Sequence, residues 1–289
     1  MRGPLGDTLG GTSEAQNTLP DSLIIALRAL SIAAGDQILM HYAAGAASES
    51  KADGSPITAA DRAAHEWIVA RLPALMPGVP IISEESFDAA EPIPDGDFWL
   101  VDPLDGTKEF LSRNGEFTVN IALIQQKTPV LGVVHVPVTG VTYAGDTGVY
   151  GDAAPQTWTW SSPDAQAQPI GVRQVPPEGL TVLASRSHGN NAALDHFLVG
   201  RTVAKVINAG SSLKFCVVAR GDADVYPRFG PTMEWDTAAG HAVLLAAGGQ
   251  VLTLEGLPLT YGKAELRNPG FIASSERHAA TSRLIRSNP

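Results

Sequence analysis

The sequence predicts an α+β half followed by an α/β half. Short β-branched segments gather between residues 81 and 144, and strand-like and helix-like segments alternate from residue 181 onward. Two apolar segments with the spacing of helices precede the strands. The chain of 289 residues is long enough for two packed layers or two subdomains with a substantial core.

The first two helices are expected on either side of a polar stretch. Apolar residues recur at helical spacing from residue 21 to about residue 44, with Asp21 as the expected N-cap. Pro56 prevents an early start of the second helix, so Thr58 is expected to cap a helix over residues 59–76. Residues 48–57 between them are polar and contain glycine, which is typical of a loop that folds over a site.

The remaining elements are expected in two groups. Apolar, β-branched segments predict an antiparallel sheet flanked by the two helices, with strands at 81–82, 98–101, 117–125, 130–136 and 141–144. Residues 151–178 are rich in Pro, Gln, Ser and Asp and predict a loop-rich connection. Beyond it we expect strands at 181–184, 202–207, 223–226 and 251–254, and helices at 192–199, 213–219 and 237–247.

Composition and charge exclude several classes of protein. The net charge of −10 argues against a nucleic-acid groove, which needs a basic face. Cys216 is the single cysteine, so no disulfide framework is expected, and its apolar neighbours predict a buried helix face. No apolar run is expected to reach the roughly 18 residues that span a bilayer. The first twenty residues lack the apolar core of a signal peptide, so we expect a disordered extension and a cytoplasmic protein, with peripheral membrane association left open.

Three acidic clusters carry the chemistry. Glu84 follows a short strand, Asp102 and Asp105 follow another, and Asp236 precedes an Ala-rich helix. Taken singly, these residues are typical of a solvated turn or a helix N-cap. Taken together, like charges at the ends of apolar elements demand a cation, and hard oxygen ligands suit Mg²⁺. Pro103 is expected to stop the strand ladder so that both neighbouring aspartates point at one place.

These clusters match a known pattern. The chain carries three motifs in order: Glu-Glu after a strand, Asp-Pro-Leu-Asp-Gly-Thr at 102–107 and Trp-Asp-Thr-Ala-Ala-Gly at 235–240. In this order they resemble the pattern of the inositol monophosphatase superfamily, whose members are Mg²⁺-dependent, lithium-sensitive phosphomonoesterases. The resemblance extends from about residue 23 to residue 273. Finer features at 51–61, 106–110, 113–120, 210–216 and 226–232 resemble the branch of CysQ-type 3′(2′),5′-bisphosphate nucleotidases. Inositol phosphatases usually carry Thr-Asn where this chain has Lys108-Glu109, which favours the nucleotidase branch.

The resemblance implies a fold and a division of the chain. The fold is a five-layer αβαβα sandwich with its active site between the two halves. Residues 1–20 are then a disordered extension, 21–178 an α+β half that holds metal and phosphate, and 179–289 an α/β half that holds the rest of the substrate.

The resemblance also implies roles at the metal site. The metal ligands are expected to hold two or three Mg²⁺ ions, and they are the carboxylates of Glu84, Asp102, Asp105 and Asp236 with the carbonyl of Leu104.

The resemblance further implies a base, and the residues that follow Asp105 predict a phosphate cradle. Asp61 takes the proton of the attacking water through the Thr107 hydroxyl, although without the resemblance it is typical of an acid in a first helical turn. The phosphate rests on the amides of Gly106 and Thr107, where a side chain on Gly106 would crowd it.

The rest of the substrate needs cationic and polar groups. Ser211 and Lys214 are expected one helical turn apart, able to reach the same anion, and Arg228 offers a planar fork for a phosphate or a base. Lys108 and His188 complete the expected set, His188 at a strand end where ligands commonly bind. Lys214 is equally typical of a lysine at the edge of the core, and an isolated histidine such as His188 is more often structural.

The expected reaction is removal of the 3′-phosphate from adenosine 3′,5′-bisphosphate, with the sulfated nucleotide PAPS as a second substrate. The alternatives are an inositol or fructose-1,6-bisphosphate phosphatase of the same fold and a non-catalytic nucleotide-binding regulator. Asp61 and Thr107 argue against a regulator, because binding alone needs no base.

Overall fold

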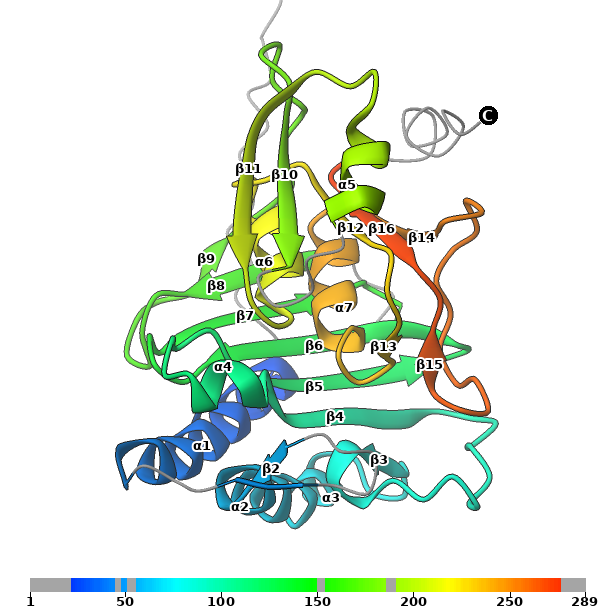
Figure 1. Cartoon of the computed structure of the whole chain (residues 1–289). Helices are drawn as coiled ribbons and strands as arrows, with labels where there is room; N and C mark the ends of the chain where they lie inside the picture. The colour runs from blue at the N-terminus through cyan, green and yellow to red at the C-terminus, as the bar shows by residue number, and fades with distance from the viewer. Residues whose placement is uncertain (1–21, 45–47, 51–55, 150–153, 186–190, 277–289) are drawn as a thin grey trace, which may run out of the picture.

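The structure, a computed structural model, describes residues 22–44, 48–50, 56–149, 154–185 and 191–276. The two larger sheets alternate with helices in five layers, as Figure 1 shows. The five-layer sandwich implied by the resemblance is therefore confirmed. The expected N-terminal extension and the Asp21 cap lie outside the described residues.

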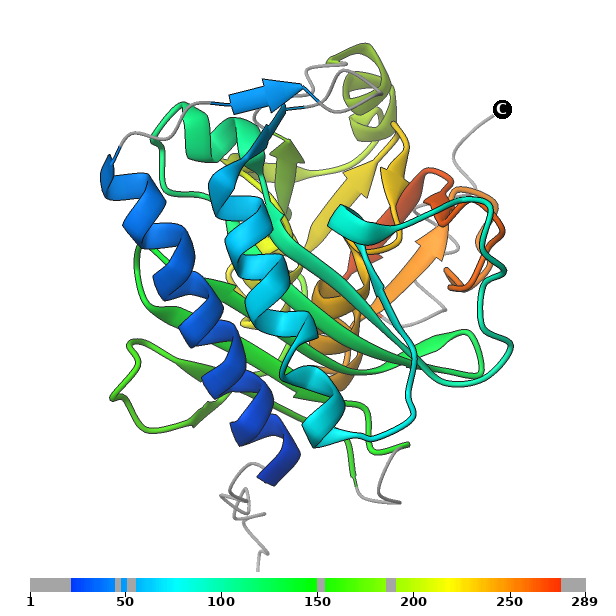
Figure 2. The same cartoon turned by 90° about the horizontal axis from the view of Figure 1, so that it is seen from below.

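The first layer consists of helices α1 (Ser22–Ala44) and α2 (Ala59–Val69) and of the short α3 (Leu72–Leu75), which follows α2 and contacts both. Figure 2 shows α1 and α2 side by side across one face of the large sheet. Thr58 caps α2 as expected. The prediction of one helix to residue 76 was wrong, because the chain turns after Val69 and restarts with Pro73 near the N-terminus of α3.

Helix α1 also corrects an expectation about membranes. By length and composition alone, Ser22–Ala44 is apolar enough to cross a bilayer, contrary to the prediction that no segment is. In the structure, however, Ile24, Leu27 and Ile38 are fully buried against the sheet and α2. The apolar character of α1 is therefore explained by its place over the core.

The second layer is a seven-stranded sheet in the order β3-β4-β5-β6-β7-β8-β9. Its strands are β3 (Ile81–Ser83), β4 (Phe98–Asp105), β5 (Thr118–Gln125), β6 (Thr128–Val136), β7 (Val141–Asp146), β8 (Gln156–Trp160) and β9 (Gln168–Pro169). The sheet is not wholly antiparallel as predicted, because β3 runs parallel to β4. Strands β8 and β9 lie in the stretch that was predicted to be loop, where Trp158 and Trp160 are buried.

The third layer holds α6 (Leu213–Ala219) and α7 (Ala238–Ala246), which lie between the sheets. Helix α7 packs closely on β5, β6 and β7 because Gly132 and Gly145 leave no side chain beneath it. A Cβ on Gly132 would lie 2.4 Å from the carbonyl oxygen of Ala239. These close contacts join the second half of the chain to the first.

The fourth layer is a five-stranded mixed sheet in the order β11-β10-β12-β16-β14, and the fifth is α5 (Asn191–Leu198). Phe197 of α5 packs with Val182, Val225 and Ile272 of this sheet. The strands are β10 (Leu180–Ser185), β11 (Val203–Ala209), β12 (Val225–Arg228), β14 (Gln250–Thr253) and β16 (Phe271–Ser274). Strand β16, antiparallel to both of its neighbours, was not predicted.

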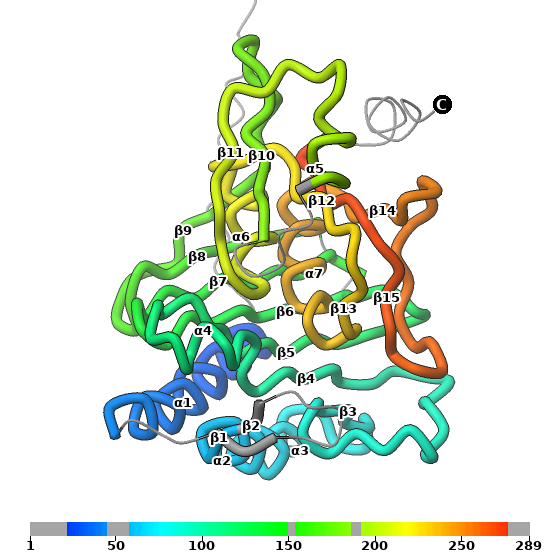
Figure 3. The backbone as a smooth tube through the Cα atoms, in the orientation of Figure 1, coloured from blue at the N-terminus to red at the C-terminus, as the bar shows by residue number. Residues whose placement is uncertain are grey.

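Smaller elements border the site. Strands β1 (Ser48–Ser50) and β2 (Pro56–Thr58) pair within the stretch predicted as a loop, and β13 (Thr232–Met233) pairs with β15 (Arg267–Asn268). Helix α4 (Thr107–Leu111) follows β4 directly, and a 3₁₀ turn η1 (Glu84–Ser86) follows β3. The backbone trace in Figure 3 shows the turn between β11 and α6 descending toward α4, so both halves of the chain meet at the end of β4.

Candidate active site

A bulge in β4 brings Asp102 and Asp105 to one face of the large sheet. The strand continues through the motif to Asp105, contrary to the expectation that Pro103 stops the ladder. Asp102 and Asp105 are three residues apart, yet they pair with residues only two apart on β5. In a regular strand they would point to opposite faces, and the extra residue of the bulge returns them to the same face. Burial agrees, because Leu100 packs on the α7 side of the sheet and Leu104 on the α1 side.

In each of three aspartates, one carboxylate oxygen accepts a hydrogen bond from the protein. Asp102 Oδ1 accepts the amide of Leu104 at 3.0 Å, and Asp236 Oδ2 accepts the amide of Met233 at 2.8 Å. Asp105 Oδ2 accepts three donors, which are the amide of Ser212 at 2.6 Å and the side chains of Thr118 and Asn120 at 3.4 Å each. This arrangement fixes the carboxylates and leaves the second oxygen of Asp105 and Asp236 for a cation.

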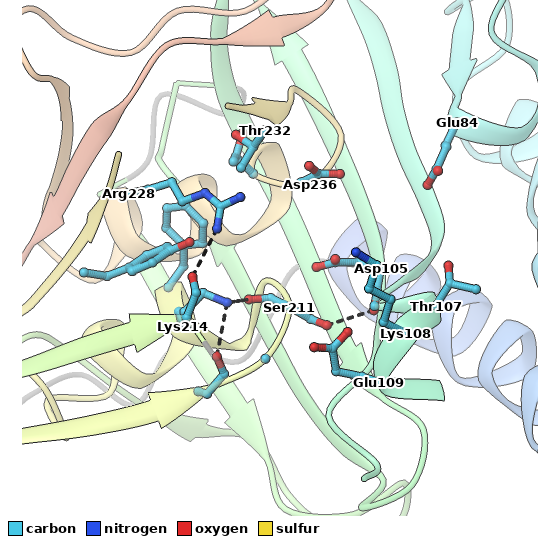
Figure 4. Close-up of a pocket in the computed structure, with 17 residues that line it drawn as sticks. Glu84, Asp105, Thr107, Lys108, Glu109, Ser211, Lys214, Arg228, Thr232 and Asp236 are labelled. Atoms are coloured by element: carbon cyan, nitrogen blue, oxygen red, sulfur yellow. Dashed lines mark hydrogen bonds between the residues drawn. The ribbon is translucent and has the colours of Figure 1, made fainter. Parts of the chain in front are cut away.

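Glu84 joins these aspartates from β3. Because β3 is parallel to β4 and Ser83 pairs with Val101, Glu84 at the end of β3 comes beside Asp102, which is still within β4. In Figure 4, Glu84, Asp105 and Asp236 face a common hollow. The N-cap reading of Asp236 is wrong, since Thr237 occupies that position of α7.

The charges of this carboxylate cluster oppose one another. Burial first, and then the charges of Glu84 and Asp105, raise the pKa of Asp102 well above its ordinary value. Burial and Asp105 likewise raise the pKa of Asp236, and burial raises that of Asp105. A divalent cation reverses this effect, because it favours the ionised carboxylates.

The cluster is not a closed cage. Among the residues that the structure describes, no three His, Cys, Asp or Glu side chains are gathered tightly enough to enclose an ion by themselves. Mg²⁺ keeps several waters and takes one or two carboxylates together with substrate phosphate. The donor set of Glu84, Asp102, Asp105 and Asp236 therefore fits Mg²⁺, and the Leu104 carbonyl stays a predicted ligand.

Asp61 and Thr107 meet beside this cluster. Thr107 Oγ1, at the start of α4, donates to Asp61 Oδ1 at 3.3 Å. The other oxygen of Asp61 accepts the amide and hydroxyl of Thr58 at 2.7 and 2.6 Å in a capping box. Burial raises the pKa of Asp61, and the hydrogen bonds from Thr58 oppose this effect. The structure thus brings together the two residues that the resemblance pairs.

Gly106 makes the turn from β4 into α4 with φ of 97°. Crowding of the phosphate was the expected reason for a glycine at this position. The structure adds a different reason, since a Cβ here would lie 2.3 Å from the Ser211 hydroxyl oxygen. Gly106 therefore permits both the left-handed backbone and the close approach of the turn before α6.

Gly106→Ala is expected to cost more stability than Gly78→Ala and to lower kcat as well. Gly78 also has a positive φ, of 83°, but nothing lies within 4 Å of an added Cβ, so it is a matched control for backbone strain alone. Urea unfolding should show a loss of about 1–2 kcal/mol for the control. A Gly106→Ala loss no larger than this, with normal kcat, would contradict the assigned contact with Ser211.

The hollow extends from the carboxylates into a cavity of about 300 Å³ between the two halves. Its far wall carries Lys214 and Arg228, shown opposite the carboxylates in Figure 4, together with the rings of Phe215 and Tyr226. Lys108 lies exposed at the rim. His188, which was expected to bind the substrate, lies outside the described residues.

The structure corrects the geometry expected for Ser211 and Lys214. Ser211 lies in a turn before α6 with φ of 48°, not on the helix. Its hydroxyl oxygen lies 2.9 Å from the carbonyl oxygen of Asp105 and 2.7 Å from that of Glu116, and the two carbonyls share its one hydrogen. Lys214 is 6% exposed, and its Nζ donates to the carbonyls of Ala209 and Ser211 at 3.3 and 2.7 Å. Burial lowers the pKa of Lys214 to about 8. Both residues line the cavity while bound to backbone, so the core-edge reading of Lys214 is correct in part.

Arg228 is held with its guanidinium at the cavity. Its nitrogens donate to the carbonyls of Gly230 and Pro231 and to the hydroxyl of Ser185, at 3.1–3.2 Å. Three further residues of the site were not predicted individually, although all of them lie in the segments 113–120 and 210–216 that carry the resemblance. They are Thr118, Asn120 and Ser212.

Fold and site together define a metal-dependent phosphatase of one family. The model of the inositol monophosphatase family matches residues 19–287, and the chain belongs to that family. Among similar proteins, the 3′(2′),5′-bisphosphate nucleotidase CysQ of Escherichia coli K12 is 47% identical over 83% of this chain and 95% of its own length. CysQ of Haemophilus influenzae is 31% identical over 88% of this chain and 93% of its own.

Solved structures give the same relation. The crystal structure of CysQ from Bacteroides thetaiotaomicron, at 40% identity, superposes with a TM-score of 0.73 over 88% of this chain and 98% of that one. SuhB from Bartonella henselae, at 23% identity and a TM-score of 0.72, covers 93% of this chain and 100% of its own and supports the fold alone.

Proposed function

We propose that this protein is a Mg²⁺-dependent 3′(2′),5′-bisphosphate nucleotidase that converts adenosine 3′,5′-bisphosphate to AMP and phosphate, with PAPS as a second substrate. The observation that carries the proposal is the cavity with carboxylates at one end and Lys214 and Arg228 at the other. A substrate with two anionic groups would place one phosphate at the metal that the carboxylates hold and the other at these two cationic side chains. Identity of 47% to the CysQ nucleotidase of E. coli supports the same substrate class.

Glu84, Asp102, Asp105 and Asp236, with the Leu104 carbonyl, would hold two or three Mg²⁺ ions. When bound, the metal supplies charge for the phosphoryl oxygens and makes water more acidic. The raised pKa values in the carboxylate cluster support a cation there, because its charge would offset the mutual repulsion.

The residues beside the cluster handle the proton and the phosphate. Asp61, through the Thr107 hydroxyl 3.3 Å away, takes the proton of the attacking water. The amides of Gly106 and Thr107, two residues that line the cavity, hold the scissile phosphate.

At the far wall, Arg228 and Lys214 bind the remote phosphate or base, with Ser211, Lys108 and His188 contributing polar contacts. Binding energy from these remote groups positions the phosphate that is cleaved. We also infer a cytoplasmic location. Cys216 is the single cysteine of the chain, and it is fully buried as a free thiol, so no disulfide is needed.

Removal of metal is expected to abolish activity. EDTA treatment should stop phosphate release, added Mg²⁺ should restore it, and excess Ca²⁺ should block it because the larger ion accepts looser geometry. Phosphate release from adenosine 3′,5′-bisphosphate measures all three. Full turnover in EDTA would refute the metal-dependent mechanism.

Arg228→Ala and Lys214→Ala are expected to lower kcat/KM for adenosine 3′,5′-bisphosphate more than for inositol 1-phosphate. Each charge-assisted hydrogen bond to the substrate is worth about 1.5–3 kcal/mol. Arg228→Lys, which keeps the charge but not the fork, should have an intermediate effect. Because Lys214 is buried, thermal melting must show that its variant is folded.

Fructose 1,6-bisphosphate serves as the third substrate in this comparison. Equal losses on all three substrates would show that these side chains do not read the nucleotide. The substrate would then be an unspecified phosphomonoester, as in the sugar-phosphatase alternatives.

A further inference from the structure

The turn between β11 and α6 is bound to the active-site loops at several points. The Gly210 amide donates to Glu116 Oε2 at 2.8 Å, and Ser211 is bound to the carbonyls of Asp105 and Glu116. Ser211 has a left-handed backbone without being glycine, so contacts must hold it there. The turn therefore has one fixed position relative to the end of β4.

Ser212 makes the contacts that reach both metal-binding aspartates. Its amide donates to Asp105 Oδ2 at 2.6 Å. Its hydroxyl donates to the carbonyl oxygen of Asp236 at 2.5 Å and accepts the side-chain amide of Asn120 at 2.9 Å. Ser212 is 1% exposed, so these bonds do not compete with bulk water.

The direction of these bonds is determined by chemistry. A hydroxyl has one hydrogen, and the carbonyl of Asp236 can only accept, so the Ser212 hydrogen goes to Asp236. The Ser212 oxygen must then accept from Asn120, which fixes the Asn120 amide with its nitrogen toward Ser212 and Asp105. Asn120 on β5, Ser212 before α6 and Asp236 before α7 thus form one connected chain of hydrogen bonds.

We propose that Ser212 is a positioning residue that sets the distance between the Asp105 carboxylate and the Asp236 loop, and so the affinity for the metal ion they share. The inference rests on the proposed function for the presence of that ion. Asp105 and Asp236 are 131 positions apart in the sequence, so the distance between them in space depends on tertiary contacts. Ser212 contacts both aspartates, and it is not itself among the described residues that line the cavity.

The proposal differs from a purely structural role. A buried serine that only stabilises the fold would lower the melting temperature and leave metal affinity unchanged. Partners that orient metal ligands typically change metal affinity by about 10–100-fold when removed. The test must therefore measure metal binding directly.

The experiment titrates the metal-free full chain with Mn²⁺ as the probe, in the absence of substrate. Calorimetry and electron paramagnetic resonance measure the binding of Mn²⁺. Ser212→Ala should weaken the tighter or the second binding event about 10–100-fold and should reduce the rise in melting temperature that Mg²⁺ produces. Ser31→Ala is the matched control. Ser31 is also fully buried and donates to a backbone carbonyl, that of Arg28 at 2.8 Å, but it lies on α1.

A second variant keeps the test decisive. Asn120→Ala should weaken Mn²⁺ binding as well, and the double variant should lose less than the product of the two single effects, because both residues act through one connection. Wild-type Mn²⁺ affinity in a folded Ser212→Ala, or an equal loss in Ser31→Ala, would overturn the inference and leave the proposed function intact. Absence of Mn²⁺ binding by the wild-type protein would overturn both.

Discussion

Asp102→Asn and Asp236→Asn are expected to remove nearly all phosphatase activity while the fold persists. Both side chains belong to the carboxylate cluster, and asparagine keeps their shape and the oxygen that accepts the amide of Leu104 or Met233. The lost charge weakens metal placement, which contributes several kcal/mol to the transition state. With about 1.4 kcal/mol per tenfold change in rate, kcat should fall by about 10²–10³ or more. Steady-state phosphate release at saturating Mg²⁺ measures this effect.

The same substitutions should raise the thermal stability of the metal-free protein. The folded protein binds the protons of Asp102 and Asp236 more tightly than the unfolded chain does, since their pKa values are raised. The stability that the protonated carboxyls give is therefore complete below the unfolded pKa of about 4 and is lost as pH rises through the folded pKa. In EDTA, the variants should melt above the wild type near neutral pH, and the difference should shrink toward about pH 4.

Asp195→Asn is the control for these measurements, because Asp195 is exposed on α5, in the fifth layer of the fold. It should change neither kcat nor the melting temperature. Near-normal kcat with unchanged Mg²⁺ dependence in Asp102→Asn or Asp236→Asn would show that the ligand assignment is wrong. A lower metal-free melting temperature in both would refute the repulsion argument.

The sequence predicts much of the fold because most elements carry local signals. Thr58 caps α2 as expected, and α6 begins and ends where the apolar pattern does, at Leu213 and Ala219. Strand β9 has only two residues, Gln168 and Pro169, and both are exposed, so no periodicity could reveal it. The parallel direction of β3 is also set by the long crossover of the chain and not by its three residues.

For the candidate site, too, local motifs predict some features, and others depend on contacts between distant segments. Motifs predict which side chains gather, and the structure brings together Glu84, Asp102, Asp105 and Asp236. The bulge in β4 could not be predicted, because it depends on pairing with β5. Ser212 was missed for a similar reason, since its partners lie far away in the sequence and its burial cannot be read from a Gly-Ser-Ser turn.

Asp61→Asn is expected to lower kcat by about 10²–10⁴, the usual contribution of a general base. Asp61 contacts Thr107 and Thr58, and the proposed nucleotide contacts lie on the far wall of the cavity, so KM should change little. Burial raises the pKa of Asp61, so wild-type kcat should rise with pH as this carboxyl loses its proton. The Asn variant should lose that acid limb of the pH profile.

The variants of Thr107 separate catalysis from helix capping. Thr107→Val removes the hydroxyl that donates to Asp61, whereas Thr107→Ser keeps it, so only the valine variant should lose the relay. If Asp61 and Thr107 act as one unit, Asp61→Asn combined with Thr107→Val should be scarcely slower than Asp61→Asn alone. Asparagine at position 61 keeps one oxygen that can accept the Thr58 amide but loses the charge, so helix stability should fall by no more than about 1 kcal/mol, which urea unfolding measures independently of kcat. A variant at Asp61 that turns over normally and is only less stable would leave this aspartate as a helix cap, and the base would have to be another group.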